Sequence, residues 1–68
     1  MERISVDSSN LVSVGYDENS CTLEVEFNND IYRYFDVPSD VYCDLMGSDS
    51  KGSYFHRNIR NSYDFEKI

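Results

Sequence analysis

The chain has 68 residues, of which 13 are acidic and six are Lys or Arg, so its formal net charge at pH 7 is −7. This length predicts a single domain, residues 1–68, with a thin core that oligomerisation or a partner would help to stabilise, because so short a chain buries only about 60% of the surface that it exposes when unfolded. An aromatic content of 15% excludes a disordered tail of the usual composition, and the acidity disfavours long-range attraction to nucleic acid or to an anionic membrane.

Three strands are predicted in the first half of the chain. Residues 11–17 combine β-branched side chains with a period of two, and residues 22–27 alternate between apolar and polar. The second segment therefore turns Leu23, Val25 and Phe27 to one face of a sheet. Thr22, Glu24 and Glu26 point to the other face, where the two carboxylates are expected to be exposed.

The third strand is predicted over residues 31–37, after the turn sequence "NND". Tyr32 and Tyr34 share one face of this strand, and Ile31, Arg33 and Phe35 share the other. Both faces carry aromatic rings, so the pattern does not decide which one is buried.

Two short helices are predicted to follow. Pro38 ends the third strand and suits the first turn of a helix over residues 38–47, with Gly47 as its C-cap. Ser50 is expected to cap a second helix that runs to about residue 62 and turns Phe55 and Ile59 to the core. The tail after Tyr63 receives no assignment. The predicted fold is α+β, a three-stranded antiparallel meander with two short helices packed on one face.

Membrane and metal sites are not expected. No stretch approaches the roughly 20 apolar residues of a membrane span, and the start "MERISVDSSN" lacks the apolar segment of a secretory signal. We therefore expect a cytoplasmic protein in which Cys21 and Cys43 are free thiols. Two distant Cys and one His do not supply the four ligands of a structural zinc site, so no metal or other cofactor is predicted.

Six short segments, in this order and at short spacings, resemble the KTSC domain family. They are "SSNLVSVGYD", "LEVEF", "YRYFDVP", "VYCDLM", "SKGSYF" and "IRNSY", and together they cover residues 8–63. The matching steps are a Tyr-x-Tyr at Tyr32 and Tyr34 followed by Val37-Pro38, a Ser-x-Gly at Ser50 and Gly52, and the pair Ile59-Arg60. The chain departs from the family in carrying "NND" where a Gly is common, and His56 where an Asn is common.

The resemblance implies a domain without an established activity. The family occurs as a C-terminal appendage of some lysyl-tRNA synthetases and as stand-alone bacterial and phage proteins. RNA binding has been suggested for it because of this attachment. If the chain binds RNA, Tyr32 and Tyr34 would be spaced to stack on successive bases; the other interpretation places both rings in the core.

One basic segment interrupts the acidic chain. Residues 50–60, "SKGSYFHRNIR", hold three of the six Lys and Arg residues and the only His, without an acid. If Ser50 caps a helix, the first-turn N–H groups and the basic side chains would form an anion site. The candidate binding residues are Ser50, Lys51, Gly52, His56, Arg57 and Arg60. The alternatives are that Asp49, Asp64 and other acids of the same chain neutralise this segment, or that it contacts a protein.

The sequence predicts a small non-catalytic binding module, because no nucleophile has a base and an orienting group beside it. One hypothesis is recognition of the phosphate of RNA, DNA or a nucleotide through the basic segment. The alternative is an acidic protein-interaction module, a phage or host accessory, that binds a basic protein through Glu24, Glu26 and their neighbours.

Overall fold

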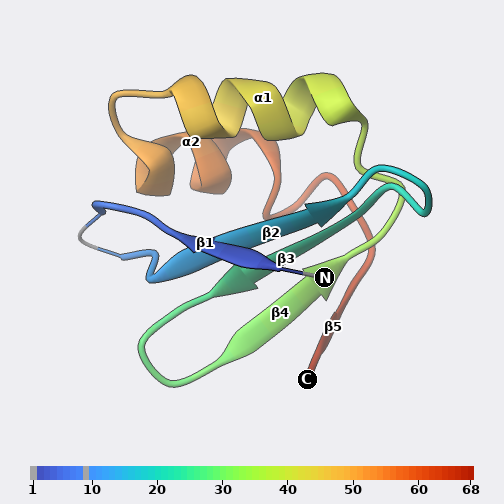
Figure 1. Cartoon of the computed structure of the whole chain (residues 1–68), viewed down its shortest axis with the longest axis horizontal. Helices are drawn as coiled ribbons and strands as arrows, with labels where there is room; N and C mark the ends of the chain where they lie inside the picture. The colour runs from blue at the N-terminus through green and yellow to red at the C-terminus, as the bar shows by residue number, and fades with distance from the viewer. Residues whose placement is uncertain (1, 9) are drawn as a thin grey trace.

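The computed structural model describes residues 2–8 and 10–68 of the chain. It has one antiparallel sheet whose five strands lie in sequence order. Two helices follow the fourth strand, cover one face of the sheet, and lead into the fifth strand at its edge (Figure 1). The elements are β1 (Arg3–Ser5), β2 (Ser13–Asp17), β3 (Thr22–Glu26), β4 (Ile31–Tyr34), α1 (Ser39–Gly47), α2 (Lys51–Asn58) and β5 (Phe65–Lys67).

The α+β class and the two helices agree with the sequence, but the prediction of three strands was wrong. The two additional strands, β1 and β5, are three residues long, lie at the two edges of the sheet, and are exposed throughout. Strands so short and so exposed show no alternation of apolar and polar residues. Their place is set by backbone pairing with β2 and β4, in the registers Ile4↔Val14 and Arg33↔Glu66.

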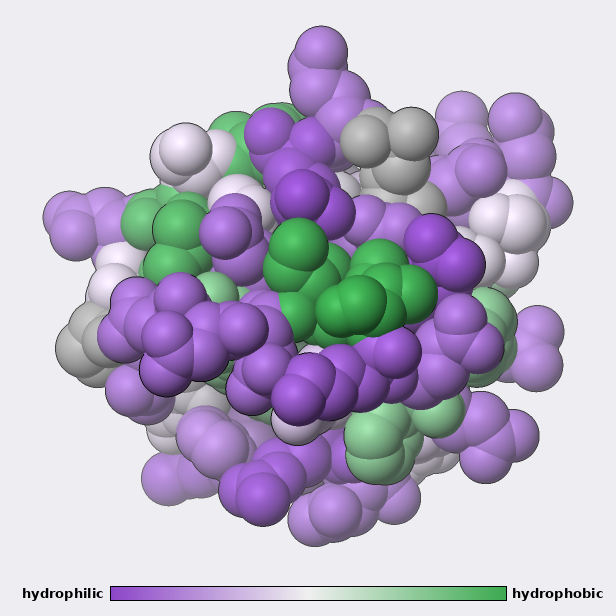
Figure 2. Space-filling model, turned by 90° about the horizontal axis from the view of Figure 1, so that it is seen from below, coloured by the Kyte–Doolittle hydropathy of each residue, from purple (hydrophilic) through white to green (hydrophobic). Residues whose placement is uncertain are grey.

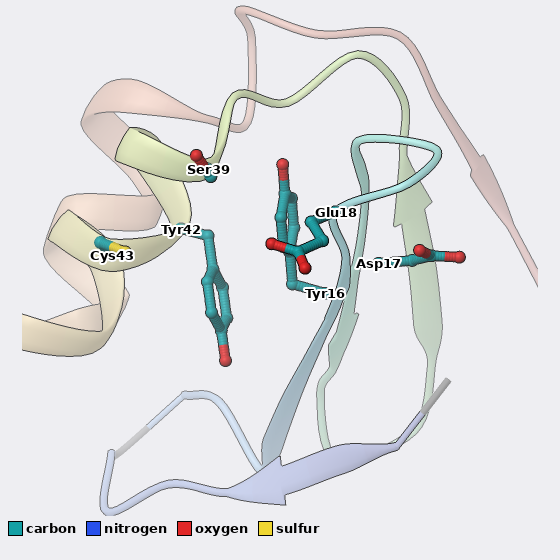
Figure 3. A pocket seen from close by; sticks show the side chains of 6 residues that line it. All are labelled: Tyr16, Asp17, Glu18, Ser39, Tyr42 and Cys43. Atoms are coloured by element: carbon teal, nitrogen blue, oxygen red, sulfur yellow. The ribbon is translucent and has the colours of Figure 1, made fainter.

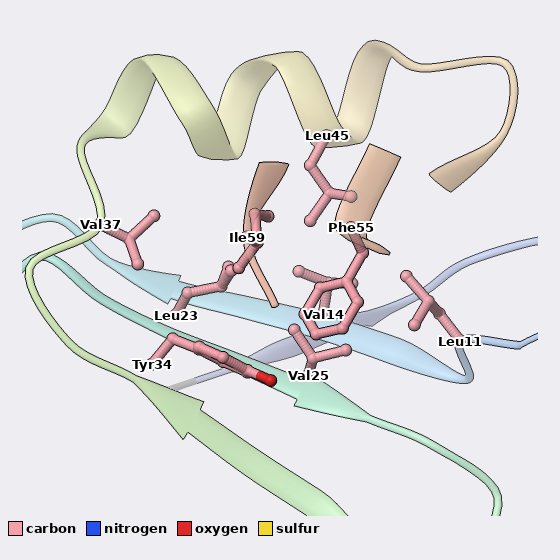
Figure 4. Close-up of a cluster of buried hydrophobic side chains, with 9 residues drawn as sticks. All are labelled: Leu11, Val14, Leu23, Val25, Tyr34, Val37, Leu45, Phe55 and Ile59. Carbon is pink, nitrogen blue, oxygen red and sulfur yellow. The ribbon is translucent and has the colours of Figure 1, made fainter. Parts of the chain in front are cut away.

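The core lies between the sheet and the helices (Figure 4). The predicted direction of Leu23 and Val25 is confirmed, since both are fully buried against the helices. Tyr34 is 1% exposed, so the face of β4 that carries the Tyr pair is the buried one. The buried apolar residues are Leu11, Val14, Leu23, Val25, Tyr34, Val37, Leu45, Phe55 and Ile59.

Helix α2 begins as the sequence predicts and ends earlier. The Ser50 side chain accepts a hydrogen bond from the Ser53 backbone N–H at 3.4 Å, which confirms the cap. The helix ends at Asn58 rather than near residue 62, and Ile59 follows as its C-cap. Phe55 and Ile59 are buried, so this short helix supplies two of the side chains that close the core. Neither α1 nor α2, nor any other part of residues 2–8 and 10–68, forms a helix long and apolar enough to cross a membrane.

The face of the sheet away from the helices carries a row of charged residues. The strand registers align Arg3, Gly15, Glu24, Arg33 and Glu66 across all five strands. Because Gly15 has no side chain, the Arg3 guanidinium reaches across it to Glu24, with Nη1 2.8 Å from Oε1. Arg33 binds the other Glu24 oxygen at 3.0 Å and lies 3.8 Å from Glu66.

This row corrects the expectation that Glu24 is exposed. Only 8% of the Glu24 side chain is accessible, because two guanidinium groups cover it. Glu26 is half-buried and accepts a hydrogen bond from the Ser13 hydroxyl at 2.7 Å. Glu24 is therefore not free to contact a basic partner, whereas Glu26 remains partly accessible. The side of the molecule opposite α1 is mostly hydrophilic, with a small apolar patch near its centre (Figure 2).

Candidate functional site

The basic segment lies on α2 and on the turn that follows it. Lys51, the first residue of the helix, folds back, and its ammonium group donates to the Ser48 carbonyl at 3.3 Å. Its side chain is half-buried in the turn between the helices. Lys51 is therefore held by the backbone of its own chain and points away from the outer face of α2.

Two backbone N–H groups in the first turn of α2 have partners within the chain. The Ser53 N–H is bonded to the cap residue, and the Tyr54 N–H donates to the Ser50 carbonyl at 3.0 Å. Gly52 is buried, and a side chain placed on it would lie 3.0 Å from the amide nitrogen of Asn10. Asn10 thus covers the backbone that a ligand was expected to approach. No periodic pattern in the sequence indicates that this loop residue packs against the helix.

The other three basic side chains remain on the surface. His56, Arg57 and Arg60 are exposed. Arg60 Nη1 lies 3.3 Å from His56 Nδ1, so the guanidinium donates to the ring nitrogen when that nitrogen is unprotonated. The His56 ring in turn contacts the edge of Phe55, at 5.9 Å between centroids. These contacts orient Arg60 along the helix, while Arg57 projects from the adjacent face.

Ion pairing separates the six Lys and Arg residues into two groups. Arg3, Arg33 and Lys67 belong to the sheet, and each pairs with a carboxylate. Lys51, Arg57 and Arg60 belong to the basic segment, and none of them forms an ion pair with an acid within residues 2–8 and 10–68. Within the described residues, neither Asp49 nor Asp64 forms an ion pair with this segment.

A shallow depression of about 310 Å³ lies beside Arg57. Its walls are mainly hydroxyl and amide side chains with one carboxylate, from Ser48, Asp49, Ser50, Ser53, Tyr54, Arg57 and Asn58. Tyr54 donates to Asp44 at 3.5 Å, and burial, followed by this carboxylate, raises the pKa of the Tyr54 hydroxyl. Asp49 in its wall and Asp44 beside the Tyr54 hydroxyl disfavour an anion within the depression.

The Tyr pair does not form an exposed stacking platform. Tyr34 packs edge-on against Phe55 at 5.4 Å, and burial, with a smaller contribution from Tyr32, raises the pKa of its hydroxyl. A smaller effect of the Arg60 charge lowers this pKa. Tyr32 is half-buried and stacks on Phe65 at 5.7 Å. Tyr34 is thus a core residue and Tyr32 packs against the core, in agreement with the structural interpretation of the pattern.

Comparison with known proteins shows the family to which the chain is related. The model of the KTSC domain matches residues 7–63. The chain belongs to the KTSC domain family. The crystal structure of a KTSC domain protein from Yersinia pestis superposes with a TM-score of 0.96 and 34% identity, covering 98% of this chain and 96% of that one. The family and the fold are thus shown by sequence and by structure together.

KTSC relatives of two kinds match the chain. An uncharacterized protein of Stutzerimonas stutzeri is 43% identical over 58 residues, which are 84% of this chain and 82% of that protein. Lysine–tRNA ligases of Nostoc punctiforme and a further Nostoc species are 33% and 39% identical over 63 and 54 residues. These matches cover 91% and 78% of this chain but only 11% and 10% of the ligases, so the chain spans about a tenth of their length.

Proposed function

We propose that this KTSC domain is a non-catalytic binding module that contacts the phosphates of RNA through Arg57 in the last turn of α2 and Arg60 in the turn that follows it. The observation that carries the proposal is the separation of the basic residues into two groups. Every Lys or Arg of the sheet is paired with a carboxylate, whereas Arg57 and Arg60 are exposed and unpaired within the described residues. Unpaired guanidinium groups are suited to bidentate contacts with phosphate.

The net charge of −7 does not prevent such a contact. Charges separated by more than about 10 Å are largely screened at moderate salt, so a phosphate at α2 responds mainly to the residues nearest to it. RNA is favoured over other phosphate sources because lysine–tRNA ligases, whose name specifies a tRNA substrate, contain this domain. His56 supports a binding role over a catalytic one, because its described side-chain partner is Arg60 rather than a Ser or Cys nucleophile.

The test is the binding of fluorescently labelled single-stranded RNA, measured by anisotropy as a function of salt. For two or three phosphate contacts the slope of log K against log salt is about −1.4 to −2.1, so affinity falls about sevenfold to twentyfold between about 50 and 200 mM salt. Arg60→Gln removes one contact, and we expect weaker binding with a slope closer to zero by about 0.7.

Lys67→Gln is the matched control, since it removes the same charge from a residue that pairs with Asp30 at the sheet edge. We expect it to leave the affinity and the salt slope nearly unchanged. Absence of binding by the wild type at low salt would refute the proposal. Equal losses for Arg60→Gln and Lys67→Gln would also refute it, because attraction would then reflect overall charge and not a site on α2.

A further inference from the structure

A second concave site lies away from α2. It is a cleft of about 460 Å³ between the β2–β3 turn and α1. Its lining residues are Tyr16, Asp17, Glu18, Ser39, Tyr42 and Cys43 (Figure 3). None of them belongs to the proposed phosphate-binding surface, and sequence reasoning assigned a function to none of them. No pattern in the sequence indicates this cleft, because Tyr16 and Tyr42 are 26 positions apart and belong to different elements.

The aromatic wall of this cleft is fixed in place before any ligand arrives. Tyr16 and Tyr42 stack with their ring centroids 4.8 Å apart and their planes within 10°. The Tyr16 hydroxyl donates to the Val37 carbonyl at 2.6 Å, and the Val37 N–H donates to the Cys21 carbonyl at 2.8 Å. Strand β2, the β2–β3 turn, the loop before α1 and α1 itself therefore hold the rings. A ligand that packs against them does not have to order them first.

The charge around the cleft is negative and has no basic counterpart in its walls. The lining comes from residues 16–18 and 39–43, and the longer segments 4–32 and 34–50 contain no Lys, Arg or His. Glu18 is exposed, and its carboxylate lies beside the stacked rings, while Asp17 points away from them (Figure 3). Burial raises the pKa of the Tyr16 hydroxyl, with further contributions from Cys21, Glu18 and Cys43, and no cation opposes them.

We propose that this cleft binds the side chain of an arginine in a basic segment of a partner protein. A guanidinium group is planar, stacks on aromatic rings, and pairs with a carboxylate through two parallel hydrogen bonds. The Tyr16–Tyr42 wall meets the first requirement and Glu18 meets the second. A compact ammonium group gains less from the rings, and an anion is repelled by the carboxylates. The sequence predicted a basic protein partner at Glu24, Glu26 and their neighbours. Under this proposal such a partner binds at the cleft instead.

The proposal can be tested by amide NMR titration of the whole chain with three blocked peptides. These are tetra-arginine, tetra-lysine, and tetra-citrulline, which keeps the shape of arginine without its charge. We expect tetra-arginine to produce saturable shifts at Glu18, Ser39 and Tyr42, tetra-lysine to bind more weakly, and tetra-citrulline to produce none. Bound tetra-arginine should also slow alkylation of Cys43, an exposed thiol in the cleft wall, when followed by peptide-level mass spectrometry.

Two matched variants distinguish binding of tetra-arginine at this cleft from non-specific attraction to the acidic protein. Glu18→Gln should weaken tetra-arginine binding about threefold to fivefold, the effect of losing one exposed ion pair. Asp64→Asn removes the same charge from a residue outside the cleft wall and should leave the affinity unchanged. Equal effects of the two variants, equal binding of the lysine peptide, or shifts that avoid the cleft would each overturn the proposal. These results are independent of RNA binding, so either proposal can fail alone.

Discussion

The buried carboxylate of Glu24 offers the sharpest test of how the sheet is held together. Glu24→Gln keeps the size of the side chain but removes its charge. The carboxylate now accepts three hydrogen bonds, one from Arg3 at 2.8 Å and two from Arg33 at 3.0 and 3.2 Å. An amide retains one acceptor oxygen and presents an N–H group to a guanidinium. One of the two arginines therefore loses its partner.

The expected loss of stability lies between the cost of breaking an ion pair on the surface and the cost of breaking a buried one. Breaking a fully buried ion pair costs about 3–5 kcal/mol, but Arg3 and Arg33 are 32% and 36% exposed and can regain water. We therefore expect Glu24→Gln to lower the free energy of unfolding by about 2–3 kcal/mol. The total for a chain of this size is about 3–10 kcal/mol, and the midpoint of thermal unfolding should fall by about 10–20 °C.

The assay is urea unfolding at neutral pH, followed by far-ultraviolet circular dichroism. Glu26→Gln is the control, because it removes the same charge from the same strand while its amide oxygen can still accept the hydrogen bond from the Ser13 hydroxyl. We expect it to lower the free energy of unfolding by about 1 kcal/mol or less. If the two variants unfold within about 0.5 kcal/mol of each other, the proposed role of the charged row is wrong.

Two further predictions concern the aromatic core and alkaline pH. Phe55→Leu should lower the free energy of unfolding by about 2 kcal/mol in the same urea assay. It removes edge contacts with Tyr34 and Phe27, each of which contributes about 0.5–1.5 kcal/mol. An unchanged unfolding midpoint would contradict this. Because the folded state raises the pKa of Tyr34 above its usual value near 10, stability should be fully present below about pH 10 and fall as the pH rises through the folded pKa. Unfolding midpoints between about pH 9 and 12 test this, and Tyr34→Phe should reduce the dependence; a flat profile would count against it.

Much of the fold could be predicted because its central elements bury one face. The alternation of β3 and the four-residue spacing of Phe55 and Ile59 follow directly from packing the sheet against two helices. The edge strands could not be predicted, since three exposed residues carry no such pattern. The burial of Glu24 depends on Arg3, 21 residues away, and on the absence of a side chain at Gly15. Only the register of the sheet brings these residues together.

The sequence predicted which residues form the basic segment, but not how their side chains are arranged in space. The cap at Ser50 and the outward direction of Arg57 and Arg60 follow from local helix geometry. The contacts that hold Lys51 at Ser48 and cover Gly52 with Asn10 depend on a turn and a loop whose conformations have no periodic signal. The cleft beside Tyr16 likewise requires the packing of α1 against the β2–β3 turn.

The order of the strands has a consequence for the way the domain folds and opens. The first four strands are joined by hairpins that close over short loops, whereas β5 must find β4 after both helices, with Tyr34 opposite Phe65. Closing the longer loop costs on the order of 1–2 kcal/mol more in chain entropy than closing a hairpin. We therefore expect β5 to dock last and to detach first. In that open state Phe65 leaves the ring of Tyr34, and the unpaired edge of β4 is exposed to pairing with another chain.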